Sequence, residues 1–217
     1  NFHYIDAGQD TLEIAFGGAS VDYAIISTFG RMLYNYDEKY LFSATIRRDG
    51  SSNFGENNRY GVFPSASFGW VASKEDFLKD SDKISFLKVR ASWGVNGSDR
   101  ISPLSYVARI QNVFTYPFGS EVQTLNTGTA LAAPPNPNVR WEESVQLDLG
   151  VELGLFDDKV SFEADVYRKQ TKDLLMTQQI PGYVGATNNP TSNLGEILNE
   201  GVEFSLGYRM GQGDLKL

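Results

Sequence analysis

The sequence has no cysteine and only one histidine, His3, among its 217 residues. Without cysteine the chain can form no disulfide framework, no thiolate zinc site and no cysteine nucleophile. A lone histidine near the start gives little basis for a Ser–His–Asp triad, so a structural role in a loop is the simpler interpretation. We therefore expect no catalytic residues, no cofactor and no metal, and we do not expect an enzyme.

Basic residues and long apolar runs are also scarce. The chain has 19 Lys and Arg against 27 Asp and Glu, and its formal net charge of −8 disfavours attraction to nucleic acid or to anionic headgroups. No apolar run approaches the roughly 18 residues that a membrane helix needs. If the chain crosses a membrane, it must do so with strands.

What the sequence does have is strict alternation of apolar and polar residues. From Ser144 to Leu155, valine or leucine occupies every odd position, and a polar residue or glycine occupies every even one. Because side chains alternate across a strand, this pattern predicts a long strand with one apolar face. The alternation resumes at Val160 after the short segment Phe156–Lys159, which indicates a hairpin.

The same alternation recurs and predicts seven strands between Ser27 and Met210, with a weaker one at Phe2–Ala7. Besides the hairpin strands Ser144–Leu155 and Val160–Val166, the predicted strands are Ser27–Tyr36, Tyr40–Arg47, Ser65–Ala72, Leu87–Asn96 and Val202–Arg209.

The connections between these strands alternate in length. Short turns are predicted at Tyr36–Lys39, Phe156–Lys159 and Gly211–Asp214, and a medium polar link with room for a helical turn at Lys74–Ser85. Long loops without regular structure are predicted at Asp49–Val62, Gly97–Arg140 and Asp173–Asn199. Short turns at one side and long loops at the other are typical of an outer-membrane β-barrel.

Strand length and aromatic placement favour a membrane barrel over a soluble sandwich. Strands of ten to twelve alternating residues match a tilted bilayer crossing and exceed the roughly five or six residues usual in globular proteins. Aromatic residues gather near the predicted strand ends, as expected of two interfacial girdles. They are Tyr34, Tyr36, Tyr40, Phe156 and Tyr208 near the short turns, and Trp93 and Trp141 at the long-loop side.

Several motifs follow one another in a fixed order along the chain. They are Thr28–Arg31, Tyr34–Ala44, Arg47–Gly55, Asn58–Trp70, Leu87–Gly94, Asn136–Glu142, Thr171–Leu175 and Asn199–Glu203. This ordered set resembles the SusC/RagA-type TonB-linked outer-membrane proteins of Bacteroidetes, and the resemblance covers nearly the whole chain from about Thr28.

The resemblance implies an all-β fold: an antiparallel transmembrane barrel of about 22 strands, of which this chain supplies about seven to nine. Residues 1–217 are then part of one barrel domain. The absence of a signal-peptide pattern at the start and the strand-like Asp214–Leu217 at the end are consistent with a piece of a longer chain. The N-terminal plug and the segment that contacts TonB lie outside the sequence.

The resemblance also implies a function. Members import an oligosaccharide or a peptide across the outer membrane, driven through TonB, together with a SusD-like surface lipoprotein. Expected partners are therefore this lipoprotein, TonB, the rest of the barrel and plug, lipid or lipopolysaccharide, and the cargo, but not nucleic acid. Two alternatives remain: a small closed outer-membrane barrel with a structural or adhesive role, and a soluble carbohydrate-binding β-sandwich.

Candidate cargo-binding residues lie where the long loops begin. Arg47, Arg48 and Asp49 can hydrogen-bond sugar hydroxyls or peptide carboxylates. The competing interpretation is that these charges pair with each other and with neighbouring strands, while Asp49–Gly50 makes a turn. Asp49, Ser51 and Asn53 alternate as in a calcium loop, but the later ligands of an EF-hand do not follow.

Aromatic residues in the long loops form the second set of candidates: Phe114, Tyr116, Phe118 and Tyr183. Their rings can stack on sugars, or they can pack a loop against itself or against a partner. The adjacent carboxylates Glu142–Glu143 and Asp157–Asp158 are interpreted as solvated charges, because neighbouring strand residues point to opposite faces.

Overall fold

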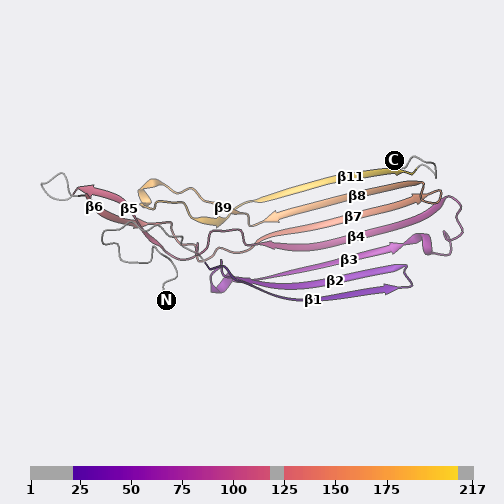
Figure 1. Cartoon of the computed structure of the whole chain (residues 1–217), viewed down its shortest axis with the longest axis horizontal. Helices are drawn as coiled ribbons and strands as arrows, with labels where there is room; N and C mark the ends of the chain where they lie inside the picture. The colour runs from indigo at the N-terminus through magenta and orange to yellow at the C-terminus, as the bar shows by residue number, and fades with distance from the viewer. Residues whose placement is uncertain (1–21, 118–124, 210–217) are drawn as a thin grey trace, which may run out of the picture.

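Seven antiparallel strands make up one open sheet in the computed structural model, which describes residues 22–117 and 125–209. In sheet order the strands are β1 (Ile25–Tyr36), β2 (Tyr40–Ser51), β3 (Tyr60–Val71), β4 (Ile84–Ser98), β7 (Glu142–Leu155), β8 (Val160–Lys172) and β11 (Glu196–Tyr208). They lie side by side in Figure 1, and each strand is antiparallel to its neighbours. The seven predicted strands are thereby confirmed. The predicted strand Phe2–Ala7 and the turn Gly211–Asp214 lie outside the described residues.

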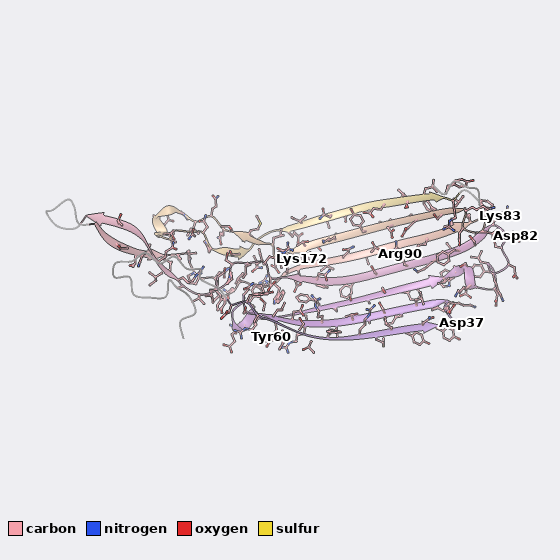
Figure 2. The ribbon with its side chains drawn as sticks, viewed as in Figure 1. Asp37, Tyr60, Asp82, Lys83, Arg90 and Lys172 are labelled. Carbon is pink, nitrogen blue, oxygen red and sulfur yellow. The ribbon has the colours of Figure 1, made fainter. Side chains whose placement is uncertain are left out.

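The tight turns 37–39 and 156–159 and the link 72–83 lie at one end of the sheet, called the turn end. The connections 52–59, 99–141 and 173–195 lie at the other end, called the loop end, so the predicted long loop Asp49–Val62 is shorter than expected. Figure 2 places Asp37, Asp82 and Lys83 at the turn end and Tyr60 and Lys172 at the loop end. The helical pieces in the described ranges are single 3-10 turns: Glu56–Asn58, Ala72–Lys74 and Gly182–Val184. None of them is long and apolar enough to span a bilayer.

Backbone conformation at the turn end sets the strand register. Asp37 and Glu38 have φ of 53° and 51°, and Lys39 N donates to Tyr36 O at 3.0 Å. Two successive residues with positive φ form the turn type whose twist matches paired strands. Phe156, Asp157 and Asp158 also have positive φ, between 55° and 59°, at the turn from β7 to β8. Both predicted turns are confirmed.

Aligned register gives the sheet two chemically different faces. One cross-strand row is apolar throughout: Tyr34, Phe42, Phe68, Ala91, Leu149, Val166 and Val202. The next row, on the opposite face, is mostly polar or glycine: Asn35, Leu41, Gly69, Arg90, Gly150, Asp165 and Glu203. We call these the apolar face and the polar face. Strand β1 is an exception, because Phe29 and Leu33 lie on the polar face.

No second sheet packs against the apolar face within the described residues. Leu149, Val166 and Val202 are each about half exposed, at 52%, 54% and 55%. A soluble sandwich would bury these side chains between its two sheets. The described part of the chain therefore does not have the core that the sandwich alternative requires. The other alternative, a small barrel that closes by itself, requires its edge strands to pair, and β1 and β11 do not pair with each other in the described residues.

Large side chains that are fully buried gather instead at the loop end. Phe54, Phe63, Val139 and Trp141 form one cluster, in which the Trp141 ring centroid lies 5.1 Å from that of Phe54 and 5.3 Å from that of Phe63. Trp141 Nε1 also donates to Arg59 O at 3.2 Å. Trp141 is only 5% exposed. Its prediction as a member of an interfacial girdle is wrong, because loop residues cover it.

The strands extend further toward the loop end than the alternation predicted. Strand β8 continues from Val166 to Lys172, and β11 begins at Glu196 rather than near Val202. In the β8 extension polar residues occupy both faces, and in the β11 extension the adjacent Ile197 and Leu198 put one apolar residue on each face. The period-two signal therefore disappears although backbone pairing continues. The alternating pattern covers only the part of a strand whose outer face meets an apolar medium. The strand itself can extend beyond that part.

The long loops contain regular structure, contrary to the prediction. Within Gly97–Arg140, strands β5 (Ile110–Pro117) and β6 (Leu125–Leu131) pair as a hairpin. Within Asp173–Asn199, the three-residue strands β9 (Leu175–Thr177) and β10 (Thr191–Asn193) pair. Both hairpins extend beyond the sheet at the loop end (Figure 1). Their short strands lack a long alternating pattern, which explains why the sequence did not reveal them.

Candidate functional site

Arg47, Arg48 and Asp49 lie in the last part of strand β2, which continues through Gly50, so the turn considered at Asp49–Gly50 is not formed. Their side chains point to different faces. Arg47 and Asp49 share the polar face, where Arg47 Nε lies 2.7 Å from Asp49 Oδ2, and Asp49 is 2% exposed. Arg48 occupies the apolar face, where its guanidinium lies 4.0 Å from the centre of the Tyr60 ring. The structure therefore brings Arg47 and Asp49 together and separates Arg48 from them.

Asp99 ties three segments together beside this pair. It accepts hydrogen bonds at Oδ2 from Ser51 Oγ at 2.6 Å and from Tyr23 OH at 2.9 Å. Asn53 Nδ2 donates to Asp99 O at 3.0 Å. The hydrogen bond to Asp99, together with burial, raises the pKa of Tyr23 above its usual value. Ser51 and Asn53 thus take part in a structural hydrogen-bond network at the loop end.

Arg90, on the polar face of β4, reaches across β7 to β8. Its Nη2 donates to Asp165 Oδ2 at 2.7 Å and to Glu163 Oε1 at 2.6 Å. Gly150 of β7 lies between them, and a Cβ at this position would overlap Asp165 Oδ1 and Arg90 Nε. The missing side chain of Gly150 is therefore what allows the Arg90 pairing. Figure 2 shows Arg90 midway along the sheet.

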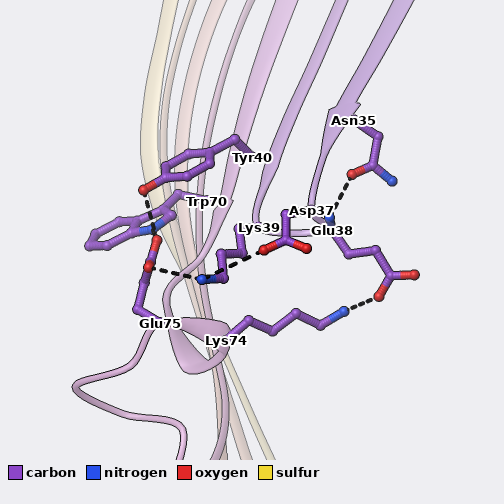
Figure 3. A network of polar contacts seen from close by, with 8 residues as sticks. All are labelled: Asn35, Asp37, Glu38, Lys39, Tyr40, Trp70, Lys74 and Glu75. Carbon is purple, nitrogen blue, oxygen red and sulfur yellow. Dashed lines mark hydrogen bonds and ion pairs between the residues drawn. The ribbon is translucent and has the colours of Figure 1, made fainter.

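Glu75 collects three donors at the turn end (Figure 3). Tyr40 OH donates to Glu75 Oε1 at 2.7 Å, Trp70 Nε1 to the same oxygen at 3.2 Å, and Lys39 Nζ to Oε2 at 3.4 Å. Tyr40 and Trp70 lie on the apolar face, opposite each other in register. The link from β3 to β4 thus supplies the polar partner for two aromatic residues at the edge of the apolar face. Hydrogen bonds from Tyr40 and Trp70 hold the pKa of Glu75 below its usual value.

A cavity of about 680 Å³ lies between the two longest loops. One wall is the segment around Ser105 and Arg109, together with Ala132, and the other runs from Ile180 to Thr191. Backbone hydrogen bonds fix the walls to each other: Asn188 N donates to Ala132 O at 2.8 Å, and Thr187 N to Leu131 O at 3.0 Å. Within the first wall, Ala132 N donates to Arg109 O at 2.7 Å.

Side-chain hydrogen bonds reinforce this junction. Asn136 Nδ2 donates to Thr191 O at 2.9 Å, and Thr187 Oγ1 donates to Ala132 O at 2.9 Å. Gln111 also hydrogen-bonds Thr187. Two loops that are separated in the sheet by β7 and β8 therefore form one joined platform around the cavity.

The four predicted aromatic candidates have different positions relative to this cavity. Tyr183 is 89% exposed, and its neighbour Gly182 lines the cavity. Phe114 and Tyr116 belong to strand β5, where they pair in register with Gly128 and Asn126. Phe118 lies outside the described residues.

The sequence alone did not identify Arg109, Asn188 or Asn189 as parts of a site. It also did not identify the space that the missing side chain of Gly150 leaves for Arg90. The sequence carries no local signal for any of them, because each matters only through a contact between segments far apart in the chain. A weak signal did exist for the cavity: the segment 174–195 contains no Asp, Glu, Lys or Arg, although 21% of the chain is charged.

Comparison with known proteins gives consistent matches. The sequence profile of the family described as "TonB dependent receptor-like, beta-barrel" matches residues 4–217. The chain is 42% identical over 185 residues to TonB-dependent receptor P3 of Formosa agariphila, covering 85% of this chain and 18% of that protein. It is 36% identical over 189 residues to TonB-dependent receptor SusC of Bacteroides thetaiotaomicron, covering 84% of this chain and 18% of the relative.

Solved structures agree with these matches. The RagAB peptide importer in its closed-closed state superposes with a TM-score of 0.79 at 26% identity, over 96% of this chain and 22% of that chain. The siderophore receptor PirA from Pseudomonas aeruginosa gives a TM-score of 0.52 at 18% identity, over 84% of this chain and 30% of that chain, which supports the fold alone. The predicted resemblance to SusC- and RagA-type proteins is confirmed, and the chain spans about a fifth of the length of its curated relatives.

Adding one methyl group at Gly150 should destabilise the protein, whereas adding one at a glycine without close neighbours should not. Gly150→Ala should displace Arg90 from Asp165 and destabilise the full-length receptor by about 1–3 kcal/mol, as overpacking usually does. Thermal or urea unfolding in detergent measures the loss. Gly69→Ala is the matched control, because Gly69 lies in the same row and its added Cβ would come no closer than 3.5 Å, to Leu41 Cβ. Equal destabilisation by both variants would contradict the proposed role of Gly150.

The Glu75 network predicts a pH-dependent contribution to stability. Because the folded-state pKa of Glu75 is lowered, its contribution is present above the pKa of the unfolded chain and is lost as pH falls through the folded value. Glu75→Ala should lower the unfolding temperature of the full-length receptor at pH 7, and this difference from the wild type should shrink below about pH 4. Asp76→Ala is the control, and a difference for Glu75→Ala that persists unchanged at low pH would argue against the network.

Proposed function

This chain belongs to the TonB-dependent receptor β-barrel family, and we propose that it forms seven strands of the barrel of an outer-membrane importer. The observation that carries the proposal is the uncovered apolar face. Leucine, valine and aromatic side chains remain about half exposed along the sheet, and a soluble protein rarely exposes so large a continuous apolar surface. Lipid acyl chains would cover this apolar surface.

The dimensions of the apolar face suit a bilayer. On β7 it runs from Val145 to Leu155, about ten residue steps, or ~33 Å along the strand at ~3.3 Å per residue. A strand tilt of ~45° reduces this to ~23 Å of height, close to the ~25 Å apolar band of outer-membrane barrels. On β8 and β11 the face ends at an exposed ion pair, Arg168 Nε to Glu200 Oε1 at 3.2 Å.

Free edges support a larger assembly. Strands β1 and β11 are the outer strands of the sheet, and within the described residues neither has a partner on its second side. Unpaired backbone groups are too costly in lipid for a sheet to end there, so further strands must flank this segment in a membrane. Lipid, and lipopolysaccharide in the outer leaflet, would contact the apolar face, and the polar face would line the lumen or the plug.

The proposed activity is TonB-driven uptake of an oligosaccharide or a peptide together with a SusD-like surface lipoprotein. TonB and the plug would act through regions of the receptor outside this chain. Similarity to SusC and to the RagAB peptide importer supports this class of activity. The joined loop platform at the loop end is the surface that a lipoprotein lid and incoming cargo would meet first. Tyr183 is a candidate to touch cargo, because its side chain is almost fully exposed and its neighbour Gly182 lines the cavity.

An arginine on the apolar face should be far more harmful than one on the polar face. Leu149→Arg places a charge near the middle of the apolar band and should cost ~2–4 kcal/mol in the full-length receptor. Gln146→Arg, on the polar face of the same strand, is the control and should be tolerated. The fraction of receptor that runs as a folded, heat-modifiable band in gel electrophoresis measures both effects. Similar folded fractions for the two variants would exclude lipid contact at Leu149.

Uptake tests the function itself. Deletion of the full-length receptor gene should abolish accumulation of the labelled glycan or peptide that the co-purifying surface lipoprotein binds. Re-expression of the receptor should restore uptake, and loss of TonB should abolish it again. Unchanged uptake in the deletion strain, or purification of the receptor without any surface lipoprotein, would contradict the proposed activity or partner respectively.

A further inference from the structure

The cavity between the two loops has an unusual charge distribution for this protein. Its volume of about 680 Å³ lies within the usual range for small-molecule sites, ~300–1,000 Å³. The chain as a whole carries eight more acidic than basic residues. Among the described residues that line the cavity, however, the single charged side chain is Arg109.

The Arg109 side chain also has no ion-pair partner among the described residues. Arg140, the next arginine along the chain, lies 2.7 Å from an Asp173 oxygen. Arg109 is exposed, and no carboxylate of the described ranges forms an ion pair with it. Its backbone carbonyl is used in the platform, but its guanidinium is available to a ligand.

The remaining polar groups of the cavity are hydroxyls and amides. Ser102, Thr191 and Asn189 contribute neutral side chains. Asn189 Oδ1 accepts from Ile180 N at 3.1 Å, which positions its amide group and leaves the NH2 to donate elsewhere. Ile180, Pro181 and Pro190 add apolar surface. Neutral donors beside apolar patches suit a ring that carries hydroxyl groups on its edge and C–H groups on its faces.

We propose that this cavity binds an acidic saccharide, with Arg109 pairing to a carboxylate or sulfate on the sugar. The exposed ring of Tyr183 at the rim provides a stacking surface for the next sugar unit. This inference rests on the proposed import function for its biological meaning, since the cavity would then be an extracellular cargo site. The binding itself does not require transport.

A free peptide fits the same cavity less well. Its terminal ammonium would find no acidic partner there, because none of the described lining residues is Asp or Glu, and Arg109 adds a like charge that repels it. A guanidinium, in contrast, pairs well with planar carboxylate or sulfate oxygens through two parallel hydrogen bonds.

Binding to the purified full-length receptor in detergent tests the proposal. The probes are tri-galacturonate, a sulfated galactotriose, neutral galactotriose and tetra-alanine, measured by calorimetry at low salt. We expect at least one acidic saccharide to bind about tenfold or more tightly than neutral galactotriose, as a charge-assisted contact provides. The two acidic probes distinguish a carboxylate ligand from a sulfate ligand.

Arg109→Gln should remove the preference for the acidic saccharide, and Arg109→Lys should retain part of it. Arg100→Gln is the matched control: Arg100 is exposed on the same loop but does not line the cavity. Each variant must retain the heat-modifiable band of the folded receptor. Tighter binding of neutral galactotriose or of tetra-alanine, no binding of any saccharide, or equal losses for Arg109→Gln and Arg100→Gln would overturn the proposal.

The outcome is separable from that of the import experiment. Arg109-dependent binding in a receptor whose deletion leaves uptake unchanged would uphold the cavity and reject the transport role. Receptor-dependent uptake of a neutral glycan or a peptide, with no Arg109-dependent binding, would uphold transport and reject the acidic ligand.

Discussion

Backbone hydrogen bonding in a medium without water is the constraint on which this sheet depends. A strand in lipid must pair on both sides, and only a closed sheet can provide this. Pairing in turn fixes which side chains face lipid, because a slip of one residue would exchange the two faces of a strand. The rows through Val166 and Asp165 show the result: two adjacent residues of β8 belong to an apolar row and to a row that is polar or glycine except at Leu41, and both rows continue across all seven strands. The strand register is therefore fixed by two factors. One is that the apolar face must meet lipid and the polar face must not, and the other is the tight turns at Asp37 and Asp157.

Aromatic residues play different roles at the two ends of the sheet. At the turn end, amphipathic rings such as Tyr40 and Trp70 keep their apolar surface on the sheet and direct their polar atoms to Glu75. This arrangement suits an interface where one end of a ring is apolar and the other meets polar groups. At the loop end, Trp141 uses the same type of ring differently, as the centre of a buried cluster that joins two loops to the sheet. Residue type alone does not distinguish these roles, since the difference comes from what covers the ring.

The sequence predicted the parts of the fold that follow from local periodicity. Alternation along Ser144–Leu155 is sufficient to identify a strand, its apolar face and the hairpin that follows, because each depends only on neighbours in the chain. It could not reveal the extension of β8 to Lys172, where polar residues on both faces remove the signal. Nor could it reveal that Arg90 reaches Asp165 over Gly150, because that contact depends on the register of three strands. The candidate site was predicted least well, since its cavity is made by loops whose contacts no periodic pattern encodes.

The sheet and the loops differ in how freely their side chains can change, and this affects how binding specificity can vary in this fold. The platform around the cavity is held mainly by hydrogen bonds between loops, such as Asn188 N to Ala132 O and Asn136 Nδ2 to Thr191 O. These two bonds involve no side chain that lines the cavity, so most lining side chains can change without breaking them; Thr187, whose Oγ1 donates to Ala132 O, is an exception. The sheet has less freedom, because every outward residue must remain compatible with lipid and a glycine such as Gly150 leaves room for a cross-strand contact. Ligand choice can therefore differ between relatives that share the same strands, through exposed loop side chains such as Arg109.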